Sequence, residues 1–129
     1  MARVELRDEI RRFILTSIPS VPYLEAILLL RSEPGTAWDA PLVARRLYIG
    51  ERQAAEVLEQ LSAAGIARHD DDAPGPYRYH PSTAELGERL DQLADAYATN
   101  LVAVTDLIHS RIDKRAHQFA DAFRLRKDT

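Results

Sequence analysis

The sequence predicts a mostly α-helical (α+β) chain with a compact head, one two-stranded β-hairpin and a long C-terminal helical tail. All seven prolines and four of the five glycines lie within residues 1–81, and none of the prolines lies within 82–129. Apolar residues recur every three or four positions through much of the chain, which is the period of buried helix faces. Two short alternating segments flank a loop rich in aspartate, proline and glycine, which is typical of a hairpin. We therefore expect a head domain over 1–81 and a tail over 82–129.

Composition limits the classes of protein that remain. A chain of 129 residues, 46% of them hydrophobic, can fill one core. The absence of cysteine excludes disulfides, thiolate metal sites and cysteine nucleophiles. The longest apolar run, 26–30, is too short for a signal or a membrane span, so we expect a cytoplasmic protein without membrane contact. The net charge of −3 requires any basic surface to be local.

Two helices are predicted at the start of the head. The first covers residues 3–17 as an amphipathic helix, and Pro19 ends it. Ser20 then caps a second helix over 21–32, in which Pro22 occupies the first turn, where a missing N–H does no harm. The second helix is apolar on most sides, which predicts the most buried element.

Two more helices and a hairpin follow. Asp39 caps a third helix that runs to Tyr48, and a fourth covers about 51–64. Gly65 ends the fourth helix by taking a left-handed conformation. Strands at 66–68 and 77–79 then form the hairpin.

The order helix, helix, turn, helix, two-stranded wing resembles the winged helix-turn-helix superfamily, of the kind found in MarR-like and PadR-like bacterial regulators. The resemblance covers about residues 20–81. It implies a winged-helix fold and a transcriptional regulator that binds DNA through the fourth helix. The residues that carry it are Leu42, Val43, Ala44, Leu47, Gly50, Ala54, Val57, Leu58, Leu61, Gly65, Ile66, Arg68 and the strand 77–79.

The first turn of the fourth helix offers side chains suited to base edges. Arginine matches guanine and glutamine matches adenine, so Arg52 and Gln53 are the expected reading residues. Arg45 and Arg46 are expected to bind phosphates or, alternatively, to pair with Glu51 and Glu56. The complete set of expected DNA contacts is Arg45, Arg46, Arg52, Gln53, Arg68 and Arg78, the last two at the base of the wing.

The charges favour a second function. Residues 41–66 hold three arginines against three glutamates, and the predicted wing loop carries three aspartates, Asp70 to Asp72. Such a surface gains little from counterion release. The alternative is therefore a winged-helix module that docks a protein partner without contacting DNA.

The tail carries an apolar stripe at alternating spacings of three and four, which is typical of a helix–helix seam. A continuous helix would extend about 66 Å, too long to bury this stripe on its own head, so we expect a homodimer in a coiled coil. Asn100 would then fix the register of the seam. The alternative is a helix hairpin broken near Ser110 within one chain. The expected dimer residues are Leu86, Leu90, Leu93, Tyr97, Leu101, Val104 and Ile108.

The end of the tail combines aromatic and basic residues. Phe119 and Phe123 lie four apart on one face, beside Arg124 and Arg126, which suits an acidic groove on a protein partner. The alternative places both phenylalanines in the dimer core and assigns the bases to the helix dipole.

No catalytic or metal site is expected, and no cofactor. His109 and His117 lie two turns apart, and no glycine-rich phosphate loop follows a strand. His69, Asp70 to Asp72 and His80 lack a fixed ligand spacing, which favours a solvated acidic loop. A third possibility is a ligand-binding cleft between head and tail near Tyr48 and Tyr97.

Overall fold

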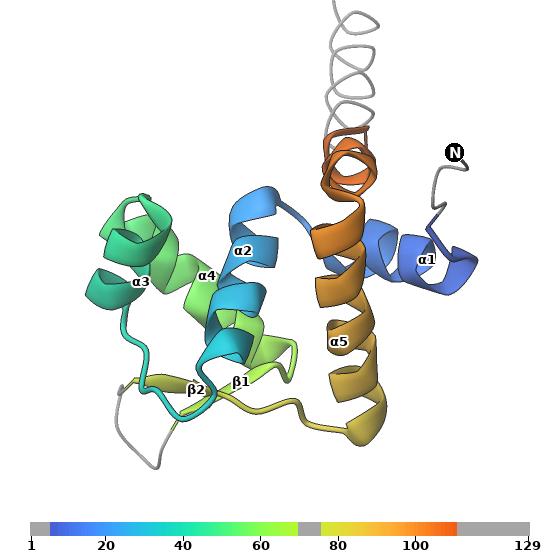
Figure 1. Cartoon of the computed structure of the whole chain (residues 1–129). Coiled ribbons are helices and arrows are strands. Elements are labelled where there is room, and N and C mark those ends of the chain that lie inside the picture. The colour runs from blue at the N-terminus through green and yellow to red at the C-terminus, as the bar shows by residue number, and fades with distance from the viewer. Residues whose placement is uncertain (1–5, 70–75, 111–129) are drawn as a thin grey trace, which may run out of the picture.

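The computed structural model describes residues 6–69 and 76–110 of the chain. The predicted class, mostly helical with one small antiparallel sheet, is confirmed (Figure 1). The elements are α1 (Asp8–Ser17), α2 (Val21–Ser32), α3 (Ala40–Leu47), α4 (Glu51–Ala63), β1 (Ala67–His69), β2 (Tyr77–Tyr79) and α5 (Ala84–Thr99). A further helix covers Leu101–Ser110.

Helix α2 lies at the centre of the head. It is apolar around most of its circumference, and α3, α4 and β2 all pack against it. In Figure 1 it stands between the pair α3 and α4 on one side and α5 on the other. The prediction that this helix is the most deeply placed element is confirmed by its buried residues, Tyr23, Leu24, Ala26, Ile27 and Leu30.

Side-chain caps fix where the head helices begin. The Ser20 hydroxyl accepts a hydrogen bond from the backbone N–H of Tyr23 at 3.3 Å, and the Asp39 carboxylate accepts one from Leu42 at 2.9 Å. Both caps were predicted from the sequence. The start of the first helix was predicted too early. Helix α1 begins at Asp8, and the backbone of the preceding residue, Arg7, is extended.

The hairpin pairs Ala67 with Tyr79 and His69 with Tyr77, so β1 begins one residue later than predicted. A third segment joins it. Trp38, in the connection between α2 and α3, exchanges two backbone hydrogen bonds with Tyr77, of 2.8 and 2.7 Å. The wing is therefore bonded to the head on the side of α3 as well as through its own chain.

Gly65 joins the end of α4 to the tail. Its φ of 76° is the left-handed conformation that was predicted. The backbone N–H of Ser82 donates to the Gly65 carbonyl at 2.8 Å. A Cβ at residue 65 would lie 2.6 Å from the Ser82 hydroxyl oxygen, so the two segments approach too closely for a side chain.

The tail is not one continuous helix, and that expectation was wrong. At Asn100 the backbone leaves the helical region, with φ −148° and ψ 56°, and α5 ends. The Asn100 carbonyl then accepts from the N–H of Val104 at 3.2 Å, which begins the next helix. Asn100 therefore forms a bend in the tail rather than a register-fixing position in a straight seam.

The tail also buries most of its stripe on its own chain, contrary to the sequence-based argument for a seam. Helix α5 packs against α1, whose Ile10 and Ile14 are buried in the same cluster. Periodicity shows that a helix needs a partner but not which helix supplies it, and α1 supplies it here. The expected dimer residues Leu90, Leu93, Val104 and Ile108 are 0–1% exposed, which assigns them to the core of the single chain.

The remaining tail residues differ in exposure. Leu86 and Tyr97 are half-buried, whereas Leu101 is 50% and its neighbour Val102 66% exposed. The division of the chain at residue 81 stays a prediction, since buried residues on both sides of it join one cluster.

Within 6–69 and 76–110, no single helix is long and apolar enough to cross a membrane, although the bent pair α1 and α2 passes that test of length and composition together.

We predict that Leu93→Ala lowers the free energy of unfolding by about 2–5 kcal/mol, because it leaves a cavity in a fully buried site. The matched control Leu15→Ala should change it by less than about 0.5 kcal/mol, since that side chain is 39% exposed. Denaturant unfolding at equal protein concentrations measures both. Equal losses in the two variants would contradict the assignment of Leu93 to the core.

Candidate nucleic-acid interface

One face of α4 is buried and the opposite face is exposed, as predicted. Ala54, Val57, Leu58 and Leu61 pack into the core, and this fixes the rotation of the helix about its axis. Arg52 and Gln53 are therefore exposed in the first turn. The outward face consists of Glu51, Arg52, Gln53, Glu56, Glu59 and Gln60.

Arg52 is almost fully open to solvent. Its side chain is 95% exposed, and its guanidinium lies 3.7 Å from the carboxylate of Glu56, one turn further along α4. Exposed pairs of this kind contribute only about 0.3–0.5 kcal/mol. The guanidinium is therefore free to leave Glu56 for a stronger acceptor.

The two arginines of α3 have different environments. Arg45 is exposed and makes no ion pair within the described part of the chain. Arg46 donates to the Glu33 carboxylate at 3.1 Å, and its guanidinium carbon lies 5.5 Å from the centre of the Trp38 ring. The expected alternative pairing of Arg46 with Glu51 or Glu56 is wrong, and Arg46 instead attaches α3 to the preceding connection.

The two arginines of the wing also differ. Arg68 and Arg78 lie opposite each other in the hairpin register, where like charges repel. Arg78 donates to the Gly35 carbonyl at 2.8 Å and so ties the hairpin to the turn after α2. Arg68 is exposed, which leaves it the better placed of the two to meet a ligand in solution.

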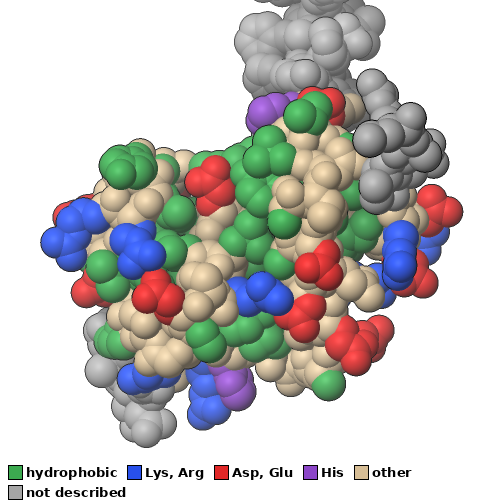
Figure 2. All heavy atoms as spheres, in the orientation of Figure 1, with side chains coloured by type: hydrophobic (Ala, Val, Ile, Leu, Met, Phe, Trp, Pro, Cys, Tyr) green, Lys and Arg blue, Asp and Glu red, His purple; other side chains and the backbone are tan. Residues whose placement is uncertain are grey.

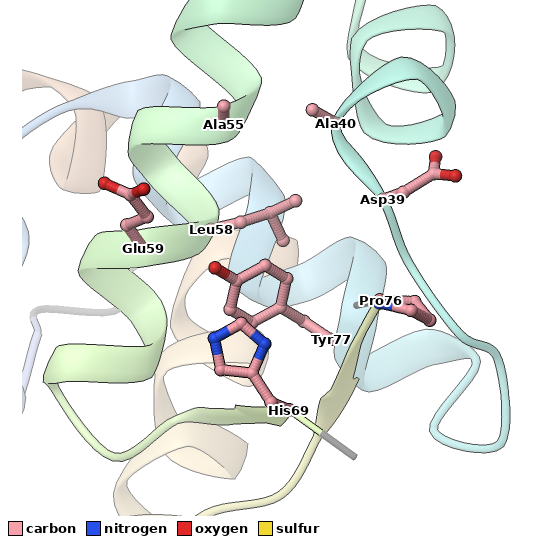
Figure 3. Close-up of a pocket in the computed structure, with 8 residues that line it drawn as sticks. All are labelled: Asp39, Ala40, Ala55, Leu58, Glu59, His69, Pro76 and Tyr77. Carbon is pink, nitrogen blue, oxygen red and sulfur yellow. The ribbon is translucent and has the colours of Figure 1, made fainter. Parts of the chain in front are cut away.

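A pocket of about 340 Å³ separates α4 from the hairpin (Figure 3). The rings of His69 and Tyr77 form one wall, with centres 4.1 Å apart and planes tilted by 38°. Burial raises the pKa of Tyr77, and the negative charge of Glu59 raises it further. The Asp39 carboxylate at the edge of the pocket points away from it (Figure 3) and caps α3.

These polar groups do not converge on one point in the pocket. Glu59 and Asp39 diverge in Figure 3, so the described lining residues form no arrangement suited to a metal or to acid–base chemistry. Across residues 6–69 and 76–110 there is no group of three His, Asp or Glu side chains that could bind a metal ion. Tyr48 does not line an enclosed cleft with Tyr97, because its side chain is 95% exposed.

A second pocket, of about 230 Å³, lies between the start of α1 and the end of α5. Its walls include Arg7, Asp95 and Asn100. It belongs to the junction where the tail bends, and it is distant in sequence from every expected DNA contact.

Acidic and basic groups alternate on the visible surface of the head. Figure 2 shows Lys or Arg side chains at the end of the molecule formed by α3 and α4, with Asp or Glu side chains between them. The surface is therefore mixed rather than a continuous basic patch. Several expected site residues lie outside the described residues: Asp70, Asp71, Asp72, His117, Phe119, Phe123, Arg124 and Arg126.

Sequence reasoning missed two residues of this region. Trp38 comes directly before the cap residue Asp39. An apolar residue at that position often packs onto the start of the helix, so the burial of Trp38 could have been predicted. It is fully buried. Tyr48 ends α3 with φ 57°, where glycine or asparagine is usual, and nothing in its residue type indicates that conformation.

The chain matches no family model and no curated protein. Among solved structures it is similar to the crystal structure of apo (heme-free) PefR, with a TM-score of 0.50 and 16% sequence identity. The match covers 89% of this chain and 87% of that one. This similarity shows that the two chains share a fold. The heme in that name concerns PefR alone.

We predict that Arg46→Ala lowers the free energy of unfolding by about 1 kcal/mol, since it removes a cation–π contact and a partly exposed ion pair. Arg45→Ala, the neighbouring control, should leave it within about 0.5 kcal/mol. Thermal or denaturant unfolding of both variants measures the difference. Two unchanged stabilities would show that Arg46 is not a structural contact.

Proposed function

We propose that this chain is a transcriptional regulator that binds duplex DNA through α4. The observation that carries the proposal is the exposure of Arg52 and Gln53 in the first turn of a helix whose opposite face is locked into the core. That turn is the part of a recognition helix that reaches base edges. The winged-helix fold supports the same function.

The other arginines divide into contacts and supports. Arg45 and Arg68 are exposed and suit phosphate oxygens on either side of the groove. Arg46 and Arg78 are engaged with Glu33 and Gly35, so their role is to hold α3 and the wing in position. The DNA contacts that we propose are therefore Arg45, Arg52, Gln53 and Arg68.

The glutamates of α4 limit how much nonspecific affinity this surface can provide. Glu51 begins the helix, and Glu56 and Glu59 follow on the exposed face. Each would repel nearby phosphates unless it accepted from a cytosine amino group. The proposal therefore expects modest affinity for random DNA and a larger share of the binding energy from base contacts.

The protein acts as a homodimer in this proposal. Leu101 and Val102 begin the helix after the bend and remain largely exposed, which leaves an apolar surface for a second copy to cover. The core residues of the tail are already buried and take no part in this contact. Two copies related by a twofold axis would present two α4 helices to two half-sites.

The second candidate is a winged-helix module that docks a protein. The observation that favours it is the acidic outward face of α4, which suits a basic partner surface better than phosphate. In this case Phe119, Phe123, Arg124 and Arg126 would add a partner contact at the tail. The two functions differ in one measurable property, the dependence of binding on DNA and salt.

We predict that Arg52→Ala weakens specific DNA binding by about 1–3 kcal/mol, or roughly 10- to 100-fold, because it removes a base contact. Fluorescence titration of genomic fragments at several salt concentrations measures the loss. Arg12→Ala, an exposed arginine on α1, serves as the control and should bind as tightly as the wild type.

Absence of salt-dependent binding in the wild-type protein would contradict the DNA-binding proposal. Retention of a protein partner by that same preparation would favour the docking module instead.

We predict that Val102→Asp converts a dimer into a monomer, because it places a charge in the apolar contact. Light scattering coupled to size exclusion measures the mass in solution. Ala98→Asp adds the same charge at an exposed site on α5 and should leave the dimer intact. A monomeric wild type, or two variants with equal masses, would remove the dimer from the proposal.

A further inference from the structure

Tyr48 occupies a backbone position that suits glycine better than any side chain. It is the one non-glycine residue with positive φ among those that the structure describes, with φ 57° and ψ 45°. The N–H of Ile49 donates to the Ala44 carbonyl at 3.1 Å, which closes the end of α3 around this conformation. A Cβ disfavours the left-handed region, so the tyrosine is retained at a conformational cost.

Packing does not explain the choice of residue. Tyr48 is 95% exposed, the most open of the large apolar side chains among residues 6–69 and 76–110. Gly50, two residues later, has φ −69°, which any residue can adopt, and a Cβ there would meet nothing within 4 Å. The turn therefore has glycine where it is not required and tyrosine where glycine would be favourable.

The surroundings of Tyr48 are those of the candidate interface. Arg45 precedes it by three residues and Arg52 follows by four, and both are exposed. The segment around the turn between α3 and α4 thus carries an exposed phenol ring with an exposed arginine before it and another after it in the sequence. A phenol hydroxyl is a donor to phosphate oxygens, and an arginine close by in the chain can supply the charge that attracts a phosphate.

We propose that Tyr48 is a phosphate-binding residue of the helix-turn-helix, whose hydroxyl donates to a backbone phosphate that Arg45 or Arg52 neutralises. The inference rests on the proposed DNA-binding function and adds a contact to it. Because the phosphate carries no sequence information, Tyr48 adds affinity for every duplex and sets how deeply α4 enters the groove. The conformational cost is then explained by the binding contact.

The test compares Tyr48→Phe and Tyr48→Gly with the wild type in titrations of a fluorescein-labelled duplex of random sequence and of a genomic fragment. Tyr48→Phe removes only the hydroxyl and should weaken binding to both duplexes equally, about tenfold. The slope of binding against salt should not change, because a neutral donor releases no counterion. Arg45→Ala, as the matched control, should reduce that slope by about one.

Tyr48→Gly separates binding from folding. Glycine accepts the left-handed conformation, so its thermal midpoint should equal or exceed that of the wild type. Its affinity should fall at least as far as that of Tyr48→Phe. Loss of binding in a variant that is equally or more stable cannot come from unfolding.

Four results would overturn the inference. Unchanged binding in both Tyr48 variants, while Arg52→Ala still weakens it, would remove Tyr48 alone and leave the DNA-binding proposal standing. Loss restricted to one sequence would make Tyr48 a base contact, and loss of a protein partner with DNA binding unchanged would make it a docking residue. A wild type without salt-dependent binding would remove both proposals together.

Discussion

The position of α2 at the centre of the head is the constraint on which the other elements depend. Because it is apolar on several sides, it can be stable in water only when other elements cover it. Helices α3 and α4 and strand β2 pack against it. That packing fixes the rotation of α4, which in turn determines that Arg52 and Gln53 are exposed while Val57 and Leu61 are not.

The arginines of α3, α4 and the hairpin fall into two groups, according to whether the side chain has a fixed partner within the protein. Those that join segments, Arg46 and Arg78, have a fixed partner, and those that reach solvent without a strong partner, Arg45 and Arg52, lie around the turn between α3 and α4. The contacts of Arg46 and Arg78 hold α3 and the hairpin in position, and Arg45 and Arg52 extend into solvent from the same part of the fold. An interface with few positive charges benefits from such stiffening, because less conformational entropy is lost when it binds.

Much of the fold could be predicted from the sequence because its signals are local. The cap residues Ser20 and Asp39, the left-handed Gly65 and the alternating hairpin strands each specify their element through neighbours along the chain. The tail could not be predicted in the same way. Its stripe showed that a partner was needed, but the covering helix α1 lies far away in sequence, and the bend at Asn100 has no proline or glycine to mark it.

The candidate site was predicted in part for the same reason. Exposure of Arg52 and Gln53 followed from helix periodicity, which is a local property. The engagement of Arg46 with Glu33 and Trp38 and of Arg78 with Gly35 depends on contacts made only after folding. The conformation of Tyr48 is imposed by bonds at the end of α3, against the preference of the residue itself.

The contact between Gly65 and Ser82 holds the end of α4 close to the segment that leads into the tail. The carbonyl of Gly65 accepts a hydrogen bond from the N–H of Ser82, and a Cβ at residue 65 would require the Ser82 side chain to move. Rotation of the tail about this point would have to carry the end of α4 with it. If two molecules associate through their tails, the distance between their α4 helices would depend on the geometry of the tail contact. A change in the tail contact would then alter the distance between the two α4 helices.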